Sequence, residues 1–305
     1  MMTDHPHNAT AAARLLHSGQ QIGARVVVSF DLRTQALVQA GLAAGTFLYI
    51  WAALLIAAGQ STDAAGNDGA PSENGFITNL LLPFFALTSL TLASRERLRA
   101  TLPSRFPSLW ILVGIACWVP FLIALFATIF GASVGWWVFP LIALCAAAPP
   151  LALAMSSALK ARASSIHPMP DGPREALSGW VIAVTLAMGM LFGLAAATST
   201  FPWGRTAGFI LLGILLTYFL FQKARWGIIH VGAEWGSAQW VGFASSFGLL
   251  VLVTVVLACT PLGSPLGEVV GIVGGVAVAA PLVFSAFRGS VIRERPEEFW
   301  DAPTV

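Results

Sequence analysis

The chain has 305 residues, of which 57% are hydrophobic and only 10% are charged, with a net charge of +2. A soluble protein usually carries about a quarter charged residues, because its surface must face water. This composition therefore excludes an ordinary soluble protein and predicts an integral membrane protein.

Long apolar runs recur along the whole chain. One helical membrane crossing needs about 20 predominantly apolar residues. The runs are 37–58, 76–93, 109–130, 134–158, 177–198, 207–222, 240–259 and 267–287. The runs 76–93 and 207–222 are short, but neither contains a charge and each ends close to basic residues. We predict an all-α fold, a polytopic membrane protein with about eight transmembrane helices.

The basic residues predict the orientation of these helices. Of the 16 Lys and Arg, all but Arg205 lie before the first run, after the last, or in connections on the same side of the membrane. The opposite side carries the acidic residues Asp63, Asp68, Glu73 and Glu268. Lys and Arg in short loops stay in the cytoplasm. We therefore expect cytoplasmic amino and carboxyl ends, and location in the cytoplasmic (inner) membrane. Residues 59–75 are expected to form an exposed loop on the other side.

A proline-rich polar stretch at the middle of the chain predicts two halves. The expected divisions are a cytoplasmic N-terminal segment 1–33, a first four-helix half 34–160, a cytoplasmic linker 161–175, a second four-helix half 176–288 and a cytoplasmic tail 289–305.

The two halves share features that suggest an internal duplication. Pro150 and Pro281 are each followed by Leu, and each precedes an arginine, Arg162 or Arg293, by 12 residues. Repeats of four helices would have the same orientation, with a pseudo-twofold axis along the membrane normal. Chance similarity between sequences rich in Ala, Leu, Val and Gly is the alternative.

No charged residue lies in the middle of a predicted helix, so the sequence lacks the usual mark of an ion or proton pathway. Hydroxyl groups and proline kinks remain as candidates for a weakly polar substrate path. The candidate path residues are Thr88, Pro150, Ser156, Ser157, Thr217 and Pro281. The alternative is that the hydroxyls bond backbone carbonyls and the prolines form ordinary kinks.

The stretch 222–240 holds the densest group of chemically active side chains. His230 and Glu234 stand four residues apart, so on a helix they would share a face. Together with Trp226 and Trp235 they form a candidate cytoplasmic docking segment, with packing at the membrane interface as the alternative. Two such residues do not make a metal site.

Other sequence features limit the chemistry. The three cysteines, Cys117, Cys145 and Cys259, all lie in apolar runs and are interpreted as small hydrophobic residues. No phosphate-binding loop, nucleophile motif or zinc-protease motif occurs, so we predict no catalytic residue, metal or cofactor, and enzymatic activity is not favoured. The scattered basic residues give no support to nucleic-acid binding.

Small residues in the last run predict close helix contacts. Gly271 and Gly275 form a GxxxG motif, which indicates either internal packing or a homo-oligomer contact. The expected partners are thus the lipid bilayer and a membrane protein or a second copy of the chain.

Three functions follow as hypotheses. The first is a permease-like protein or a membrane subunit of a transport or export assembly. The alternative is a noncatalytic membrane scaffold, regulator or immunity-type partner. A membrane enzyme acting on lipid-linked substrates has the least support, because no acid–base pair is visible.

Overall fold

The computed structural model describes residues 32–66, 76–97, 107–130, 132, 134–163, 174–201, 203–221, 224, 227–260 and 264–291. Predictions for the N-terminal segment up to residue 31, for most of the linker, for the tail after residue 291 and for Trp226 lie outside these ranges.

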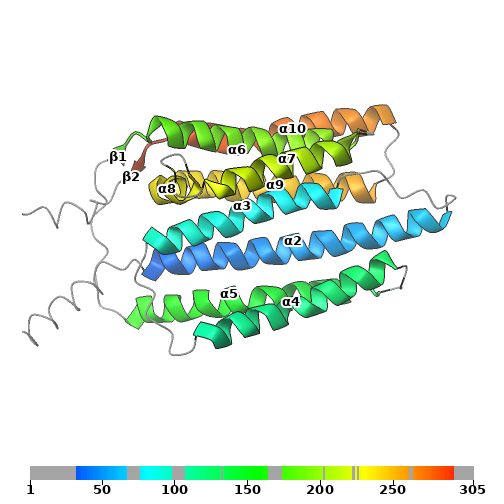
Figure 1. The fold of residues 1–305 in the computed structure, drawn as a ribbon, viewed down its shortest axis with the longest axis horizontal. Coiled ribbons are helices and arrows are strands. Elements are labelled where there is room, and N and C mark those ends of the chain that lie inside the picture. Colours follow the sequence, from blue (N-terminus) through cyan, green and yellow to red (C-terminus); the bar gives the residue numbers. More distant parts are fainter. Residues whose placement is uncertain are drawn as a thin grey trace, which may run out of the picture.

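Each apolar run of the sequence corresponds to a helix in the described part of the chain (Figure 1). The helices are α2 (Leu32–Gly66), α3 (Phe76–Arg97), α4 (Pro107–Ile129), α5 (Val138–Ala163), α6 (Gly179–Thr198), α7 (Gly204–Leu220), α9 (Ser237–Cys259) and α10 (Ser264–Ala286). A short helix, α8 (Ile228–Glu234), stands between α7 and α9.

Five of these helices, α2, α5, α6, α9 and α10, are long and apolar enough to cross a membrane. Shorter apolar segments occupy α3, α4 and α7, at Asn79–Thr91, Leu112–Thr128 and Thr206–Tyr218. The prediction of a helical, multi-pass membrane protein is confirmed.

Two local features differ from the expectation. Helix α2 continues to Gly66, so residues 59–66 are helical although we expected a loop to begin at 59. Alanines 57, 58, 64 and 65 favour the helix and offset the Gly and Asp residues among them. In addition, β1 (Arg174–Glu175) pairs antiparallel with β2 (Ser290–Val291), which joins the end of the linker to the segment after α10.

Successive long helices run in alternating directions, so the start of α2 and the end of α10 lie at the same end of the bundle (Figure 1). Lys160 and Arg162, in the last turn of α5, lie at that end as well. We call it the linker end, because α5 ends and α6 begins there, and we call the opposite one the far end.

The helices pack as two groups that meet at α2 and α3. Helix α5 packs along α2 and against α4, while α10 packs along α6 and α9. Helix α3 lies between the groups and contacts α2, α7, α8 and α9, and α2 also contacts α9. The buried core is continuous from Leu54 on α2 and Leu80 on α3 to Phe192 on α6 and Leu250 on α9.

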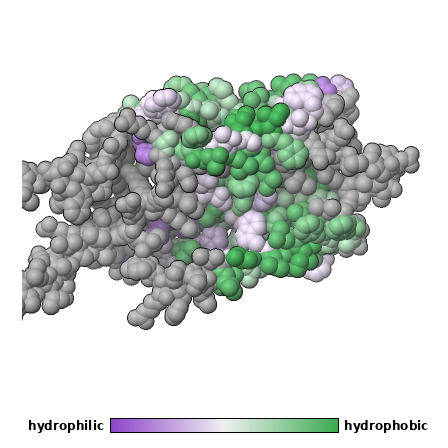
Figure 2. Space-filling model, viewed as in Figure 1, coloured by the Kyte–Doolittle hydropathy of each residue, from purple (hydrophilic) through white to green (hydrophobic). Residues whose placement is uncertain are grey.

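The described part of the face seen in Figure 2 is mostly apolar, and large apolar side chains are exposed along the helices. On α4 the large side chains of Leu112, Ile115, Ile123 and Phe126 are all exposed, with Ile123 at 63%. A soluble protein rarely exposes a continuous patch of this kind. Lipid contact explains it.

Exposed tryptophans lie near both ends of the bundle. Trp180 lies at the start of α6 and Trp203 follows its end, and both are exposed. The 20 residues of α6 span about 30 Å, which is the thickness of the hydrocarbon layer. Trp136 and Trp137 lie before α5, at the same end as Trp203. Tryptophan favours the two membrane–water interfaces, so these residues are placed where a bilayer would end.

Candidate functional site

The hydroxyls of the candidate path bond to their own helices. Thr88 Oγ1 donates to the Phe85 carbonyl at 3.0 Å, and Thr217 Oγ1 donates to the Gly213 carbonyl at 2.8 Å. Ser156 Oγ donates to the Leu153 carbonyl at 2.9 Å. A hydroxyl bonded in this way needs no ligand to satisfy it.

These residues also lie on helices that do not share one contact region. Ser156 and the buried Ser157 lie on α5, which packs against α2 and α4. Thr217 lies on the exposed side of α7, which packs against α3 and α6, and Thr88 is half-buried on α3. The structure therefore does not bring the predicted hydroxyls together.

The two predicted prolines are half-buried in their helices, Pro150 in α5 and Pro281 in α10. Pro281 lies at a tight contact with α9: a Cβ atom built on Gly242 would be 2.8 Å from the Pro281 carbonyl oxygen. The absence of a side chain at Gly242 is what lets α9 approach the proline turn so closely.

Three residues of the predicted docking segment fall within the described ranges. Trp235 is buried, and its indole Nε1 donates to Thr185 Oγ1 on α6 at 3.0 Å. Glu234 Oε2 accepts from the backbone N–H of Ser178, just before α6, at 3.2 Å. His230 is exposed. Helix α8 packs against α3, so this segment is part of the bundle and Trp235 is not available on its surface.

The GxxxG motif of α10 is occupied by α6. A Cβ atom on Gly275 would be 2.5 Å from the Gly193 carbonyl oxygen, and a Cβ atom on Gly193 would be 2.7 Å from the Gly275 carbonyl oxygen. Gly271 lies against Thr200 and the carbonyl of Ala197. Of the two interpretations of this motif, the structure supports internal packing.

Two amides that the sequence analysis did not single out connect distant helices. Asn79 on α3 is buried, and its Nδ2 donates to the Ala195 carbonyl of α6 at 2.7 Å. That carbonyl is one of the last four of α6, which lack a donor within the helix. Asn79 Oδ1 has no hydrogen-bond partner. An amide inside the apolar run 76–93 was the signal that could have identified it.

The second amide is Gln239, in the first turn of α9. It is fully buried, and its Nε2 donates to the carbonyls of Ser285 and Arg288 at 2.8 and 2.7 Å. Its Oε1 accepts from the N–H of Gly236 at 3.0 Å. Through these hydrogen bonds, the Gln239 side chain links the end of α10 to the start of α9.

One buried hydroxyl at the middle of the bundle is not bonded at all. Ser246 on α9 is 0% exposed, and its Oγ has no partner, whereas Thr254 on the same helix donates to the Leu250 carbonyl at 2.7 Å. Ser246 stands one turn after Gly242, on the side of α9 that faces α10.

On α10, proline at 281 removes the N–H that would normally bond the Ala277 carbonyl. Ser246 and Ala277 each lie nine residues from the linker end of their helices, at a depth of about 14 Å. An unbonded hydroxyl and a carbonyl without its usual donor thus occur at the same depth on two packed helices, near the middle of a hydrocarbon layer about 30 Å thick.

Within the described ranges, no group of three or more His, Cys, Asp or Glu is placed to hold a metal ion. The structure does bring two cysteines together that the sequence analysis treated as independent. The thiols of Cys117 on α4 and Cys145 on α5 are close neighbours. Cys259, at the end of α9, stands apart from this pair in the sequence and in the helix order.

This contact predicts selective cross-linking. We expect a short bis-maleimide to join Cys117 to Cys145 within one chain in detergent-solubilised protein, because the α4–α5 hairpin holds the two thiols together. Peptide mass spectrometry should find that cross-link and leave Cys259 singly modified. A cross-link between Cys259 and either of the other two, at similar yield, would contradict the arrangement of α4 and α5.

The described residues define a polytopic helical membrane protein. Comparison with protein-family models, with curated proteins and with solved structures finds no match for this chain.

Proposed function

We propose that the protein is a permease-like membrane protein of eight crossings, with both ends in the cytoplasm and location in the inner membrane. Helices α3 and α4 have 22 and 23 residues, or about 33 and 35 Å, and α7 has 17 residues, or about 26 Å. Against a hydrocarbon layer of about 30 Å, these lengths support a crossing by each. The distribution of Lys and Arg supports the orientation.

The arrangement of the helices supports a division into two related halves. In each half, the first helix packs along the fourth: α2 along α5, and α6 along α10. Buried positions of α5 recur 132 residues later in α10: Phe139 and Gly271, Ala143 and Gly275, Ala146 and Val278, Ala154 and Ala286. In this register Pro149, rather than Pro150, corresponds to Pro281.

The first helices of the two halves support the same division. Seven buried positions of α2 recur 139 residues later as buried positions of α6, and they include Thr46 and Thr185. In transporters built from parallel repeats, each helix of one half corresponds to a helix of the other half.

The observation that carries the proposal is the unbonded, buried Ser246 hydroxyl on α9, one turn after Gly242, which packs against Pro281 of α10. Buried polar atoms nearly always have a partner, and an exception calls for an unseen one such as water or a ligand. Pro281 also leaves one carbonyl of α10 without its usual donor, and freed backbone carbonyls at membrane depth can contact substrates in transporters. We infer that water or a small polar substrate reaches this point, with Asn79 Oδ1 as a second polar contact toward the far end.

Water access to Ser246 tests the proposal without knowledge of the substrate. Single cysteines are introduced into a background in which Cys117, Cys145 and Cys259 are replaced by Ala. We expect Ser246→Cys in vesicles to react with a charged, membrane-impermeant methanethiosulfonate. Ile123→Cys, exposed on the lipid-facing side of α4, should not react, because a charged reagent does not enter the hydrocarbon layer. Ser72→Cys and Ser164→Cys provide references for the two sides of the membrane.

The outcome separates two functions. If Ser246→Cys stays as unreactive as Ile123→Cys from both sides, the path is absent and the permease proposal fails. The second candidate, a noncatalytic scaffold, regulator or immunity-type partner, would then account better for the structure. It is supported by the hydroxyls of Thr88, Ser156 and Thr217, which are bonded within their own helices.

A further inference from the structure

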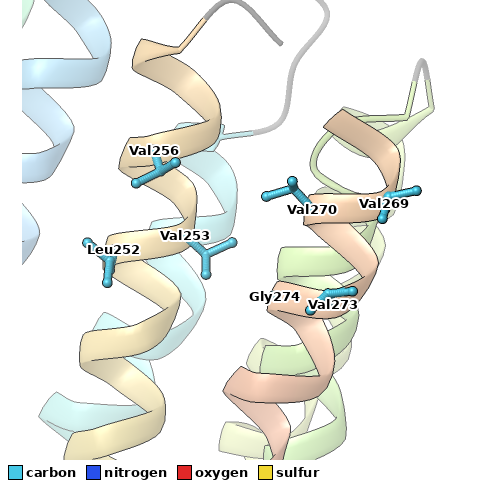
Figure 3. A pocket seen from close by; sticks show the side chains of 7 residues that line it. All are labelled: Leu252, Val253, Val256, Val269, Val270, Val273 and Gly274. Carbon is cyan, nitrogen blue, oxygen red and sulfur yellow. The ribbon is translucent and has the colours of Figure 1, made fainter. Parts of the chain in front are cut away.

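A groove lies between α9 and α10, toward the far end of the bundle (Figure 3). Its volume is about 360 Å³. Its lining comes from seven residues without a polar side chain: Leu252, Val253, Val256, Val269, Val270, Val273 and Gly274.

The groove arises because the two helices separate after a close contact. Nearer the linker end, Gly242 lies against Pro281 and Ser285, where a Cβ atom would be 2.6 Å from Ser285 Oγ. Farther along, Gly274 still lies against Val253, and beyond it the helices stand apart around the lining side chains (Figure 3). Gly274 forms the floor, and the valines form the walls.

The groove opens onto the lipid-facing surface. Leu252 and Val273 on its rim are 58% and 63% exposed, whereas Gly274 is buried. On α9 the lining lies about 5–11 Å from the helix end, and on α10 about 8–15 Å from the helix start. It therefore occupies the hydrocarbon half-layer next to the α9–α10 connection, the depth at which lipid chains lie.

An apolar space of this size does not hold ordered water, because water needs several polar partners. If the groove were empty, the side chains that line it would lack dispersion contacts on the side that faces it. We propose that the groove is a lipid site that holds one acyl chain of a bilayer phospholipid, with the headgroup at the end of the bundle where α9 and α10 are connected. The site is separate from Ser246 and does not depend on the proposed path.

Photo-labelling tests this site. The full-length protein is reconstituted in phosphatidylcholine nanodiscs that contain a trace of phosphatidylcholine with a diazirine near the middle of one acyl chain. After illumination, we expect labelled peptides from α9 and α10 to exceed those from the exposed side of α4 several-fold. Lipid at an unstructured surface would label Leu112, Ile115 and Ile123 on α4 equally well.

A groove-filling variant provides the specific comparison. In Val273→Phe the ring would occupy the groove, and labelling of α9 and α10 should fall to the level of α4. Ile123→Phe, a substitution at an equally exposed site, should leave the labelling pattern unchanged. Val256→Phe serves as an independent second filling variant. Equal labelling of the two regions in the unchanged protein, or undiminished labelling of α9 and α10 in both filling variants, would overturn the proposal.

Discussion

Replacing Gly275 with Ala is expected to destabilise the bundle by about 1–3 kcal/mol, the usual cost of forcing an extra methyl group into a filled contact. The new Cβ atom would lie 2.5 Å from the Gly193 carbonyl oxygen and 2.9 Å from Ala197 Cβ. Neither neighbour is the end of a flexible side chain, so α6 and α10 must move apart. The measurement is the midpoint of thermal unfolding in detergent, which should fall by several degrees.

The contact between Gly193 and Gly275 is reciprocal, so a substitution on the α6 side is also expected to destabilise the bundle. Gly193→Ala would place its Cβ atom 2.7 Å from the Gly275 carbonyl oxygen. Because one separation of the helices relieves both clashes, the double variant should be less destabilised than the sum of the single variants.

Gly114→Ala on α4 is the matched control. Nothing lies within 4 Å of a Cβ atom at that position, so only the higher helix propensity of alanine remains. Its unfolding midpoint should stay the same or rise. Equal losses in Gly114→Ala and Gly275→Ala would contradict the close packing of α6 on α10.

The helices and their order could be predicted because the membrane constrains each apolar segment separately, independently of the rest of the chain. Every backbone polar group in hydrocarbon must be bonded within the segment, so each apolar run of sufficient length becomes a helix. The runs that correspond to α6, α9 and α10 agree with the observed bounds to within three residues. The start of α2 and its extension to Gly66 were less predictable, because helix ends outside the hydrocarbon depend on ordinary, weaker propensities.

Contacts between distant helices could not be derived from the same rule. Trp235 is as suitable for the membrane interface as for a buried position with a hydrogen bond, and its contacts with Thr185 on α6 and Phe243 on α9 decide between them. The partners of Asn79 and Gln239 lie 116 and 46–49 residues away in the chain, so neither bond leaves a local pattern.

The candidate site was predictable only in its residue types. The sequence singled out hydroxyls and prolines as the possible polar features, and the unbonded hydroxyl of Ser246 lies one turn after Gly242, which packs against Pro281. Which hydroxyl lacks a partner depends on rotamers and on the helix opposite, so Ser246 could not be distinguished from Thr254 in the sequence.

Gln239→Leu is expected to lower stability by about 1–3 kcal/mol, because it removes both side-chain donors from a fully buried position. The Ser285 carbonyl keeps a second donor, the Arg288 N–H at 3.0 Å, whereas the Arg288 carbonyl, just after α10, loses the Gln239 donor. A carbonyl left without a partner costs about 1–3 kcal/mol, and leucine fills the space of glutamine without donating to the Arg288 carbonyl. The Gly236 N–H loses its acceptor as well.

The same substitution should loosen the linker end before the rest of the bundle. Hydrogen–deuterium exchange is expected to rise in the last turn of α10 and the first turn of α9, with little change at the far ends of these helices. Ser237→Ala, two residues earlier and exposed, is the matched control and should change stability by less than about 0.5 kcal/mol. Gln239→Glu should resemble Gln239→Leu, since an ionised carboxylate accepts hydrogen bonds but cannot donate them to two carbonyls. If Gln239→Glu kept the native exchange pattern, the donor role assigned to Nε2 would be wrong.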